Sequence, residues 1–282
     1  MPFPLRAPYL WNLRTTSLSL GPTTRVMGIL NVTPDSFSDG GAFATATEAI
    51  ESALAMFEDG ADIVDIGGES TRPGKREPVN AQQEMDRVLP VLEGIRTHRP
   101  ESILSIDTYK SATAKEVLKA GAEIINDVSG LQWDPAMAKV CASAGCGLVM
   151  MHTRGRPEDW HALGPLEANQ VKAELCDRLN QAMQEGVEQQ RVVLDPGFGF
   201  GKAGNQNYEL LARLEDPSTL GRPLLAGVSR KRFLGREVGQ REIASLAAAV
   251  AAILSGAHLI RVHNVRSSRE AADVADAILT AR

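Results

Sequence analysis

The sequence predicts an α/β fold, a (β/α)8 TIM barrel, formed by a single domain over residues 1–282. Short apolar runs recur along the chain, and each is followed by a turn containing Gly, Pro, Asn or Asp and then by a segment of helical periodicity. This alternation is typical of parallel βα units. The runs are apolar on both faces, as strands of a sheet covered by helices must be. Eight such units fill the chain and favour a barrel over an open doubly wound sheet.

The eight predicted strands are short and rich in aliphatic and β-branched residues. Between them lie amphipathic stretches with apolar residues three and four apart, from Ala46 to Phe57 and again at Ala271, Val274, Ala275 and Ile278. Each strand is therefore expected to be followed by its own helix. The predicted strands are Arg25–Asn31, Ala61–Gly68, Ser102–Asp107, Glu123–Asp127, Gly147–His152, Arg191–Gly197, Pro223–Ser229 and His258–Asn264.

The first 24 residues precede the first strand of the barrel and have a different pattern. Apolar residues alternate at Tyr9, Trp11 and Leu13, and then at Leu18 and Leu20, on either side of a Thr/Ser turn. Because alternation with a period of two indicates β-strands, we expect residues 1–24 to form a hairpin. This hairpin would cap the bottom of the barrel, at the N-terminal ends of its strands.

The most apolar stretch of the chain is Ile243 to Leu254. It is too short to span a membrane and is apolar on nearly every side, so it predicts a helix that is covered all round. The barrel core would cover one face. The other face would pack either on neighbouring helices of the same barrel or on a second copy of the chain, which makes a homodimer the expected assembly.

Composition and charge exclude several classes of protein. The chain is 43% hydrophobic, and 30 Lys+Arg against 35 Asp+Glu give a net charge of −5. Its basic residues are scattered, which argues against a nucleic-acid or membrane surface. Three cysteines without C-x-x-C spacing predict neither a disulfide framework nor a zinc site. With no signal peptide, we expect a cytoplasmic protein that binds anions only in a local pocket.

Polar residues gather where the predicted strands end. In a barrel of this kind the C-terminal ends of the strands converge on one mouth, where the chemistry takes place. Asp and Asn after a strand can also cap a helix or form an Asx turn, which is the favoured interpretation for Asp127. The strand-end residues are Asn31, Glu69 to Arg72, Asp107, Asn126, Asp127, His152, Asp195, Ser229 to Lys231, Arg261 and His263.

These strand-end residues divide by chemistry into two groups. Cations and an amide suit a diphosphate, and they are Arg72, Lys231, Arg261, His263 and Asn31. Carboxylates and an amide suit the N–H edge of an aminopyrimidinone ring, and they are Asp107, Asn126 and Asp195. A ligand with a heterocycle at one end and a phosphate tail at the other would satisfy both groups. His263 alone could be a buried structural histidine, but its i, i+2 relation to Arg261 puts both on one face of a strand.

Glycine-rich and long loops adjoin these strand ends. The stretch Gly199–Gly204 formally matches G-x-G-x-x-G, but the match is weak, and it is not a Walker A loop because Ala203 follows Lys202. It is either a simple tight turn or one that offers Phe200 to a flat ring. The polar segments 31–44 and 68–80 are long for βα loops and would stand over the mouth. Phe37 is expected either as a gate or ring contact or as a residue that packs within its own loop.

Long motifs of the chain resemble the dihydropteroate synthase family, in the family's order from Arg25 to the C-terminus. Two of the motifs have ten or more residues, which makes the resemblance specific. They are MGILNVTPDSFSDGG with Asn31, DIGGESTRPG with Thr71 and Arg72, SIDTYK with Asp107, IINDVSG with Asn126, LDPGFGFGK with Asp195, VSRK with Lys231, and IRVHN with Arg261 and His263.

The resemblance implies that p-aminobenzoate condenses with 6-hydroxymethyl-7,8-dihydropterin diphosphate to give dihydropteroate and diphosphate. It implies Mg²⁺ as cofactor, with Asn31 at the metal site, and a homodimer. The pterin would be held by Asp107, Asn126, Asp195, Lys231 and Thr71, with Met151 and Phe200 also binding substrate. The diphosphate would be bound by Arg261 and His263. The p-aminobenzoate pocket would be shaped by Phe37, Ser70, Arg72 and Pro73. Catalytic roles would fall to Asp107, Lys231 and Arg72.

Charge considerations favour a dissociative displacement. Neutralised diphosphate is a good leaving group, and the dihydropterin ring can carry the developing positive charge beside a carboxylate such as Asp107. Loop closure would keep water from the cation. We predict that Asp107→Asn does not retain full activity.

The chain departs from the family pattern in a few places. Asn264 stands where Asp is common, Arg232 stands where a small residue is frequent, and Met150–Trp160 differs from the usual M-H-M-x-G-x-P. Asn264 could weaken the orientation of its neighbours His263 and Arg261, and Arg232 is either an added cation at the site or a solvated surface residue. These departures bear on substrate affinity and sulfonamide sensitivity rather than on the reaction class.

Two other functions are compatible with such a barrel. A pterin-binding methyltransferase, which transfers a methyl group to a corrinoid, would have little use for Arg72, Lys231, Arg261 and His263 together. A non-catalytic pterin-binding or assembly protein would be expected to lose charged site residues, and here they are present. Release of diphosphate that depends on both substrates separates the three functions.

Overall fold

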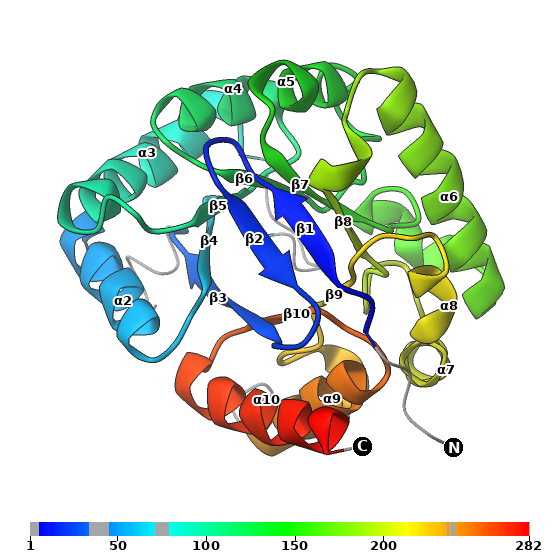
Figure 1. The fold of residues 1–282 in the computed structure, drawn as a ribbon. Helices are drawn as coiled ribbons and strands as arrows, with labels where there is room; N and C mark the ends of the chain where they lie inside the picture. Colours follow the sequence, from blue (N-terminus) through cyan, green and yellow to red (C-terminus); the bar gives the residue numbers. More distant parts are fainter. Residues whose placement is uncertain (1–5, 34–44, 71–78, 236, 238–240, 282) are drawn as a thin grey trace.

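The computed structural model describes residues 6–33, 45–70, 79–235, 237 and 241–281. Within them, eight parallel strands lie in the order β8-β7-β6-β5-β4-β3-β10-β9. A parallel bridge between Leu194 and Leu224 brings the two outer strands together and closes the barrel. Helices surround the strands on the outside (Figure 1). The predicted (β/α)8 TIM barrel is therefore confirmed.

The strands and helices alternate along the chain as the sequence predicts. The barrel strands are β3 (Arg25–Asn31), β4 (Ile63–Gly67), β5 (Leu104–Asp107), β6 (Ile124–Asp127), β7 (Gly147–Met151), β8 (Val192–Asp195), β9 (Leu225–Ala226) and β10 (Leu259–Val262). The helices are α2 (Ala46–Glu58), α3 (Ala81–His98), α4 (Ser111–Lys119), α5 (Met137–Ala144), α6 (Ala168–Gln184), α7 (Gly204–Ala212), α8 (Glu215–Ser218), α9 (Glu242–Leu254) and α10 (Val265–Thr280). Short 3-10 helices cover Pro157–Ala162, Gln189–Arg191 and Arg232–Leu234.

One strand is much shorter than predicted. The sequence predicts a strand over Pro223–Ser229, but the sheet includes only Leu225–Ala226. After Ala226 the chain leaves the sheet. At Arg230, the first residue after the predicted strand, φ is +57°, a left-handed conformation that no strand contains.

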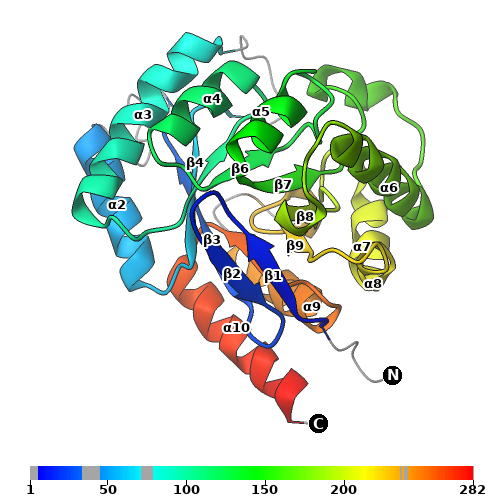
Figure 2. The same cartoon turned by 45° about the horizontal axis from the view of Figure 1, so that its top comes forward.

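The N-terminal hairpin closes the bottom of the barrel as predicted. Strands β1 (Tyr9–Asn12) and β2 (Ser17–Leu20) pair antiparallel, and they lie across one end of the barrel (Figures 1 and 2). Trp11, Leu13 and Leu20 are buried among residues at the N-terminal ends of the barrel strands. The Trp11 indole Nε1 donates a hydrogen bond of 2.7 Å to the Arg191 carbonyl. The hairpin is therefore held on the barrel both by apolar packing and by a hydrogen bond.

Helices α9 and α10 pack side by side (Figure 1). Helix α9 has nearly the predicted bounds, but within the single chain it is not covered all round, because Ile243 is 83% exposed. The apolar face predicted for α10 is partly wrong, because Val274 is 61% exposed and Ile278 is 42% exposed. The buried face of α10 instead contains Ala272, Ala275 and Leu279. It also contains Asp276, which accepts hydrogen bonds of 2.6 Å from both Arg6 and the Thr24 backbone N–H.

Two further features concern the whole described chain. Within its described ranges, no helix combines the length and the apolar character needed to cross a membrane. Cys141, Cys146 and Cys176 are free thiols.

Candidate active site

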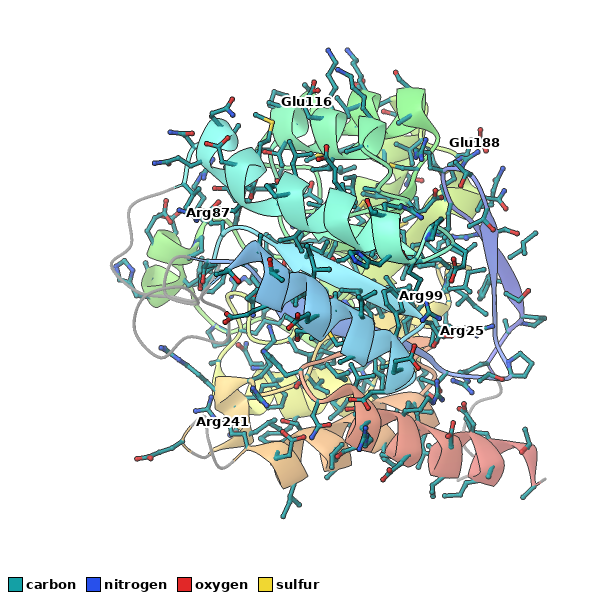
Figure 3. The ribbon with its side chains drawn as sticks, turned by 90° about the vertical axis from the view of Figure 1, so that its left-hand side faces the viewer. Arg25, Arg87, Arg99, Glu116, Glu188 and Arg241 are labelled. Carbon is teal, nitrogen blue, oxygen red and sulfur yellow. The ribbon has the colours of Figure 1, made fainter. Side chains whose placement is uncertain are left out.

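A cavity of about 820 Å³ opens at the C-terminal ends of the barrel strands. Figure 3 shows Arg241, which lines this cavity, at the end of the barrel opposite the hairpin, whereas Arg25 lies beside the hairpin. Every predicted site residue within the described ranges lines this one cavity. They are Asn31, Ser70, Asp107, Asn126, Met151, Asp195, Phe200, Lys231, Arg261 and His263. The other four, Phe37, Thr71, Arg72 and Pro73, lie outside the described residues.

Strand register brings part of this set into a row. Across β3, β4, β5 and β6, Asn31 pairs with Gly67, Gly67 with Asp107, and Asp107 with Asn126. A Cβ atom on Gly67 would lie 3.6 Å from Asn31 Oδ1 and 3.6 Å from the Asp107 Cβ. Glycine therefore leaves room in the row between an amide oxygen and a carboxylate.

Arg261 is held by two carboxylates. Its Nε donates to Asp65 Oδ2 at 2.6 Å, and its Nη2 donates to Asp107 Oδ2 at 2.8 Å. The same Asp65 oxygen accepts a hydrogen bond of 2.9 Å from Asn126 Nδ2. Asp65 therefore fixes a guanidinium and an amide that both face the cavity, and Arg261 connects the cationic group of predicted residues with the carboxylate group.

Burial and charge set the ionisation of this cluster. Burial raises the pKa of Asp107 to about 7, although Arg261 pulls it in the opposite direction. Burial opposes the charge of Arg261, but Asp65 and Asp107 outweigh that cost and raise the pKa of the guanidinium. Burial also raises the pKa of Asp195. The carboxylates thus lie in a site of low polarity, where their interaction with a developing cation is strong.

The turn after β8 shapes another wall of the cavity. Asp195 Oδ1 accepts a hydrogen bond of 2.7 Å from the Gly197 N–H, where φ is +69° and a Cβ atom would collide with the His152 carbonyl oxygen. Buried Lys202 donates to the Gly197 carbonyl at 2.7 Å and to the Phe200 carbonyl at 3.2 Å. These bonds present the Phe200 ring, whose centroid lies 4.3 Å from Lys231 Nζ.

Two strand-end residues have structural roles instead. Asp127 accepts from the Ser129 N–H at 2.7 Å and from the Leu131 N–H at 2.9 Å, so the turn-capping interpretation holds. His152 is buried, its Nε2 lies 3.0 Å from Glu174 Oε2, and burial lowers its pKa to about 3. Neither side chain lines the cavity.

The structure also locates Asn264 and Arg232, two residues that depart from the family pattern. Asn264 caps α10, because its side chain accepts from the Ser267 N–H at 3.2 Å. Orientation of Arg261 comes from Asp65 and Asp107 rather than from Asn264. Arg232 lines the cavity and is exposed to solvent as well.

Sequence reasoning missed Asp65, and it placed Ser229 at a strand end without giving it a role. Asp65 is a charged residue inside the otherwise apolar run of β4, and that interruption was the available signal. Ser229 Oγ lies 3.0 Å from His263 Nδ1, a contact between residues 34 positions apart in sequence that no local pattern reveals.

The donor set at the mouth suits a metal bound mainly through a substrate. Among the described residues, no group of three or more His, Cys, Asp or Glu side chains is placed to hold a metal ion. The amide oxygen of Asn31, facing the space that Gly67 leaves open, is a hard oxygen ligand. Mg²⁺ is commonly held by one or two protein oxygens together with substrate phosphates and water, so Asn31 fits that ion.

Comparison with known proteins agrees on one family. The family model described as pterin binding enzyme matches residues 27–263. The chain is 42% identical over 273 residues to the dihydropteroate synthase of Escherichia coli K12, covering 95% of each protein. It is also 42% identical over 279 residues to the mitochondrial folate synthesis bifunctional protein of Arabidopsis thaliana, of which it spans 50%.

Solved structures of the same kind share the fold. The Yersinia pestis dihydropteroate synthase with a sulfonamide drug complex superposes with a TM-score of 0.89, at 39% identity, covering 97% of this chain and 100% of that chain. The Burkholderia cenocepacia enzyme complexed with 7,8-dihydropteroate superposes with a TM-score of 0.84, at 37% identity, covering 97% and 98%.

Proposed function

The chain belongs to the pterin-binding enzyme family as a dihydropteroate synthase, and from this premise we propose that the cavity at the barrel mouth is its active site. Dihydropteroate synthase joins p-aminobenzoate to 6-hydroxymethyl-7,8-dihydropterin diphosphate in folate biosynthesis. The observation that carries the assignment of the site is the convergence of ten predicted side chains on one cavity. The reaction breaks the bond between the pterin methylene carbon and a diphosphate oxygen, forms a carbon–nitrogen bond, and releases an arylamine proton.

The pterin is proposed to bind against the carboxylates and amide of the strand ends. Asp107, Asn126 and Asp195 offer oxygen acceptors to the N–H groups of the ring, and Lys231 with Thr71 and Met151 completes its contacts. Phe200 supplies an apolar face for the ring plane. These side chains come from neighbouring strands of a closed barrel, which holds them in fixed relative positions.

The diphosphate is proposed to bind to Arg261 and His263. Since Asp65 and Asp107 already hold Arg261 Nε and Nη2, the guanidinium is oriented before the substrate arrives, and its other N–H groups meet the phosphate oxygens. The family is magnesium-dependent. When bound, Mg²⁺ neutralises diphosphate charge, and we propose Asn31 as its protein ligand.

We propose a dissociative displacement for the chemical step. As the carbon–oxygen bond lengthens, positive charge spreads into the dihydropterin ring, and ionised Asp107 stabilises it in a buried site. The weakly nucleophilic arylamine then attacks the cation. Phe37, Ser70, Arg72 and Pro73 are proposed to shape the p-aminobenzoate pocket, with Arg72 also neutralising charge near the diphosphate.

We propose that the chain forms a homodimer through α9 and α10. Ile243 on α9 and Val274 and Ile278 on α10 are large apolar side chains exposed to solvent on packed helices. Light scattering on the purified chain tests this, with a mass of about twice the 30.3 kDa of one chain as the expected result. We further propose that residues 1–282 act as one domain in the cytoplasm.

Kinetics with both substrates test the proposed active site. Diphosphate release is measured with pterin diphosphate and p-aminobenzoate together and with each alone, and is repeated with sulfamethoxazole. We expect release only with both substrates, inhibition by the sulfonamide, and a loss of about 100-fold or more in an Arg261→Ala variant, because removal of one partner exposes two buried carboxylates to each other. An Arg261→Ala variant with unchanged kinetics would place the active site elsewhere.

A further inference from the structure

The Ser229 hydroxyl contacts His263 at two atoms. Its Oγ accepts a hydrogen bond from the His263 backbone N–H at 3.3 Å, and it lies 3.0 Å from the ring nitrogen Nδ1 of the same residue. Both residues line the cavity, Ser229 just beyond β9 and His263 just beyond the neighbouring strand β10. The serine therefore fixes both the backbone and the ring of His263.

The contact between the Ser229 hydroxyl and the ring depends on the tautomer of His263. A backbone N–H can only donate, so Ser229 Oγ is an acceptor in that bond. The same oxygen has a second lone pair for an Nδ1–H and one hydrogen that it can donate to an unprotonated Nδ1. In the second arrangement the ring proton of neutral His263 is on Nε2, and Nε2–H is a donor suited to a phosphate oxygen.

Ser229 is itself held by a strained residue. Arg230, which follows it, has a φ of +57°, a conformation that residues other than glycine adopt rarely and that persists only where the surroundings enforce it. The enforcing contacts come from the start of α9: the Arg230 N–H donates to Ser245 Oγ at 2.9 Å, and Arg241 Nη1 donates to the Arg230 carbonyl at 2.9 Å. Ser245 Oγ in turn donates to the Arg241 carbonyl at 2.6 Å.

We propose that Ser229 is a positioning residue that holds neutral His263 with its Nε2–H directed to the diphosphate, and that Ser245 and Arg241 hold Ser229 in place through Arg230. The inference rests on the proposed role of His263 in diphosphate binding. It assigns to the serine of the S-R-K triplet a function separate from that of Lys231. Binding of the diphosphate then does not require a protonated imidazole.

The first experiment determines the imidazole tautomer directly. The protein has five histidines, so ¹⁵N-histidine labelling with a His263→Gln variant for assignment identifies the His263 signals. In the wild type at a pH where the ring is neutral, we expect the Nε2–H form. In Ser229→Ala, the neutral ring should show a mixture of both forms. A wild-type ring in the Nδ1–H form would overturn the proposal, and this measurement needs no variant of Ser229 to fold.

The second experiment measures binding of inorganic diphosphate by calorimetry and the kinetics with both substrates. Ser229→Ala should weaken diphosphate binding and raise KM for pterin diphosphate by about fivefold to tenfold, the effect of one ordinary hydrogen bond, with KM for p-aminobenzoate unchanged. Ser229→Thr keeps the hydroxyl and should remain within about twofold of the wild type. Ser218→Ala is the matched control, because its hydroxyl is exposed and bonds only to the Glu215 carbonyl among the contacts found in the described chain.

The variants separate failure of this inference from failure of the proposed function. If His263→Gln binds diphosphate as tightly as the wild type, the role of His263 is refuted. If His263→Gln binds more weakly while Ser229→Ala binds normally, the role of Ser229 alone is overturned. A parallel loss in Ser229→Ala and Ser229→Thr would also contradict the proposal, since the threonine retains the donor.

Discussion

Replacement of Asp65 by Asn perturbs the centre of the candidate site without touching a substrate. Asp65 is fully buried, and one of its oxygens accepts hydrogen bonds from Arg261 Nε at 2.6 Å and from Asn126 Nδ2 at 2.9 Å. Its other oxygen, Oδ1, has no hydrogen-bond partner in the described part of the chain. An asparagine can place its oxygen at the shared position and its amide nitrogen at the position of Oδ1, so the variant should fold.

The expected loss follows from the charge. Hydrogen bonds to charged groups contribute about 1.5–3 kcal/mol each, roughly twice the value of neutral ones. The asparagine keeps the geometry of both bonds but removes the charge, so about half of two such bonds, or about 1.5–3 kcal/mol, is lost. If this preorganisation acts in the transition state, kcat/KM for pterin diphosphate falls about 10-fold to 100-fold, at about 1.4 kcal/mol for each factor of ten.

The assay is steady-state release of diphosphate dependent on p-aminobenzoate, with thermal unfolding as a check of the fold. Asp62→Asn is the matched control, because Asp62 makes the same kinds of bond at the other end of β4, to Arg25 Nη1 at 2.8 Å and to the Val26 N–H at 2.8 Å. The control should change kcat/KM by less than about twofold. A folded Asp65→Asn enzyme with kcat/KM within about threefold of the wild type would show that the charge of Asp65 does not preorganise the site.

Three further predictions concern the pH dependence of the rate, the Phe200 ring and the N-terminal hairpin. Burial raises the pKa of Asp107 to about 7, so its carboxylate is increasingly protonated as the pH falls through that value. A pH–rate profile should therefore show that kcat/KM for pterin diphosphate falls below about pH 7 and is level above it. The Asp107→Asn variant should lose this pH dependence and have a kcat lower by at least about tenfold. Full activity in that variant would argue against the dissociative course. Phe200→Leu removes the ring that lies 4.3 Å from Lys231 Nζ and should raise KM for pterin diphosphate by about threefold to tenfold with little change in KM for p-aminobenzoate; equal changes in both constants would contradict a pterin contact. Trp11→Ala should lower the free energy of unfolding by about 3–5 kcal/mol in denaturant titrations, because it leaves a cavity under the hairpin and removes the hydrogen bond to the Arg191 carbonyl. The kcat of the remaining folded enzyme should stay within about twofold of the wild-type value.

Much of the barrel could be predicted because its strands carry a strong local signal. Buried parallel strands are continuous apolar runs, and β3 has the predicted bounds of Arg25–Asn31. The end of β9 could not be predicted, since Gly227 and Val228 extend the strand-like run by two residues while the chain leaves the sheet after Ala226. The face of α10 was misassigned because Asp276 is buried by partners more than 250 residues away in sequence. Such long-range polar contacts do not appear in the periodicity of the sequence.

The candidate site could be predicted where chemistry coincides with position. Polar residues at the ends of apolar strands must meet at the mouth of a barrel, and Asn31, Asp107 and Asn126 do lie in register there. Asp65 and the role of Ser229 could not be predicted because both residues act on other side chains, and a partner of a guanidinium or an imidazole is identified only when the position of that group is known. The roles of Phe37, Thr71, Arg72 and Pro73 stay predictions from the family resemblance.

The most direct test of the proposed active site is diphosphate release by the wild-type enzyme, measured with pterin diphosphate alone and with p-aminobenzoate added, in parallel with formation of dihydropteroate. We expect one dihydropteroate for each diphosphate, and no appreciable release until the arylamine is present. Release without the arylamine, or no release with both substrates, would contradict the assignment of the barrel mouth as a site that joins the two.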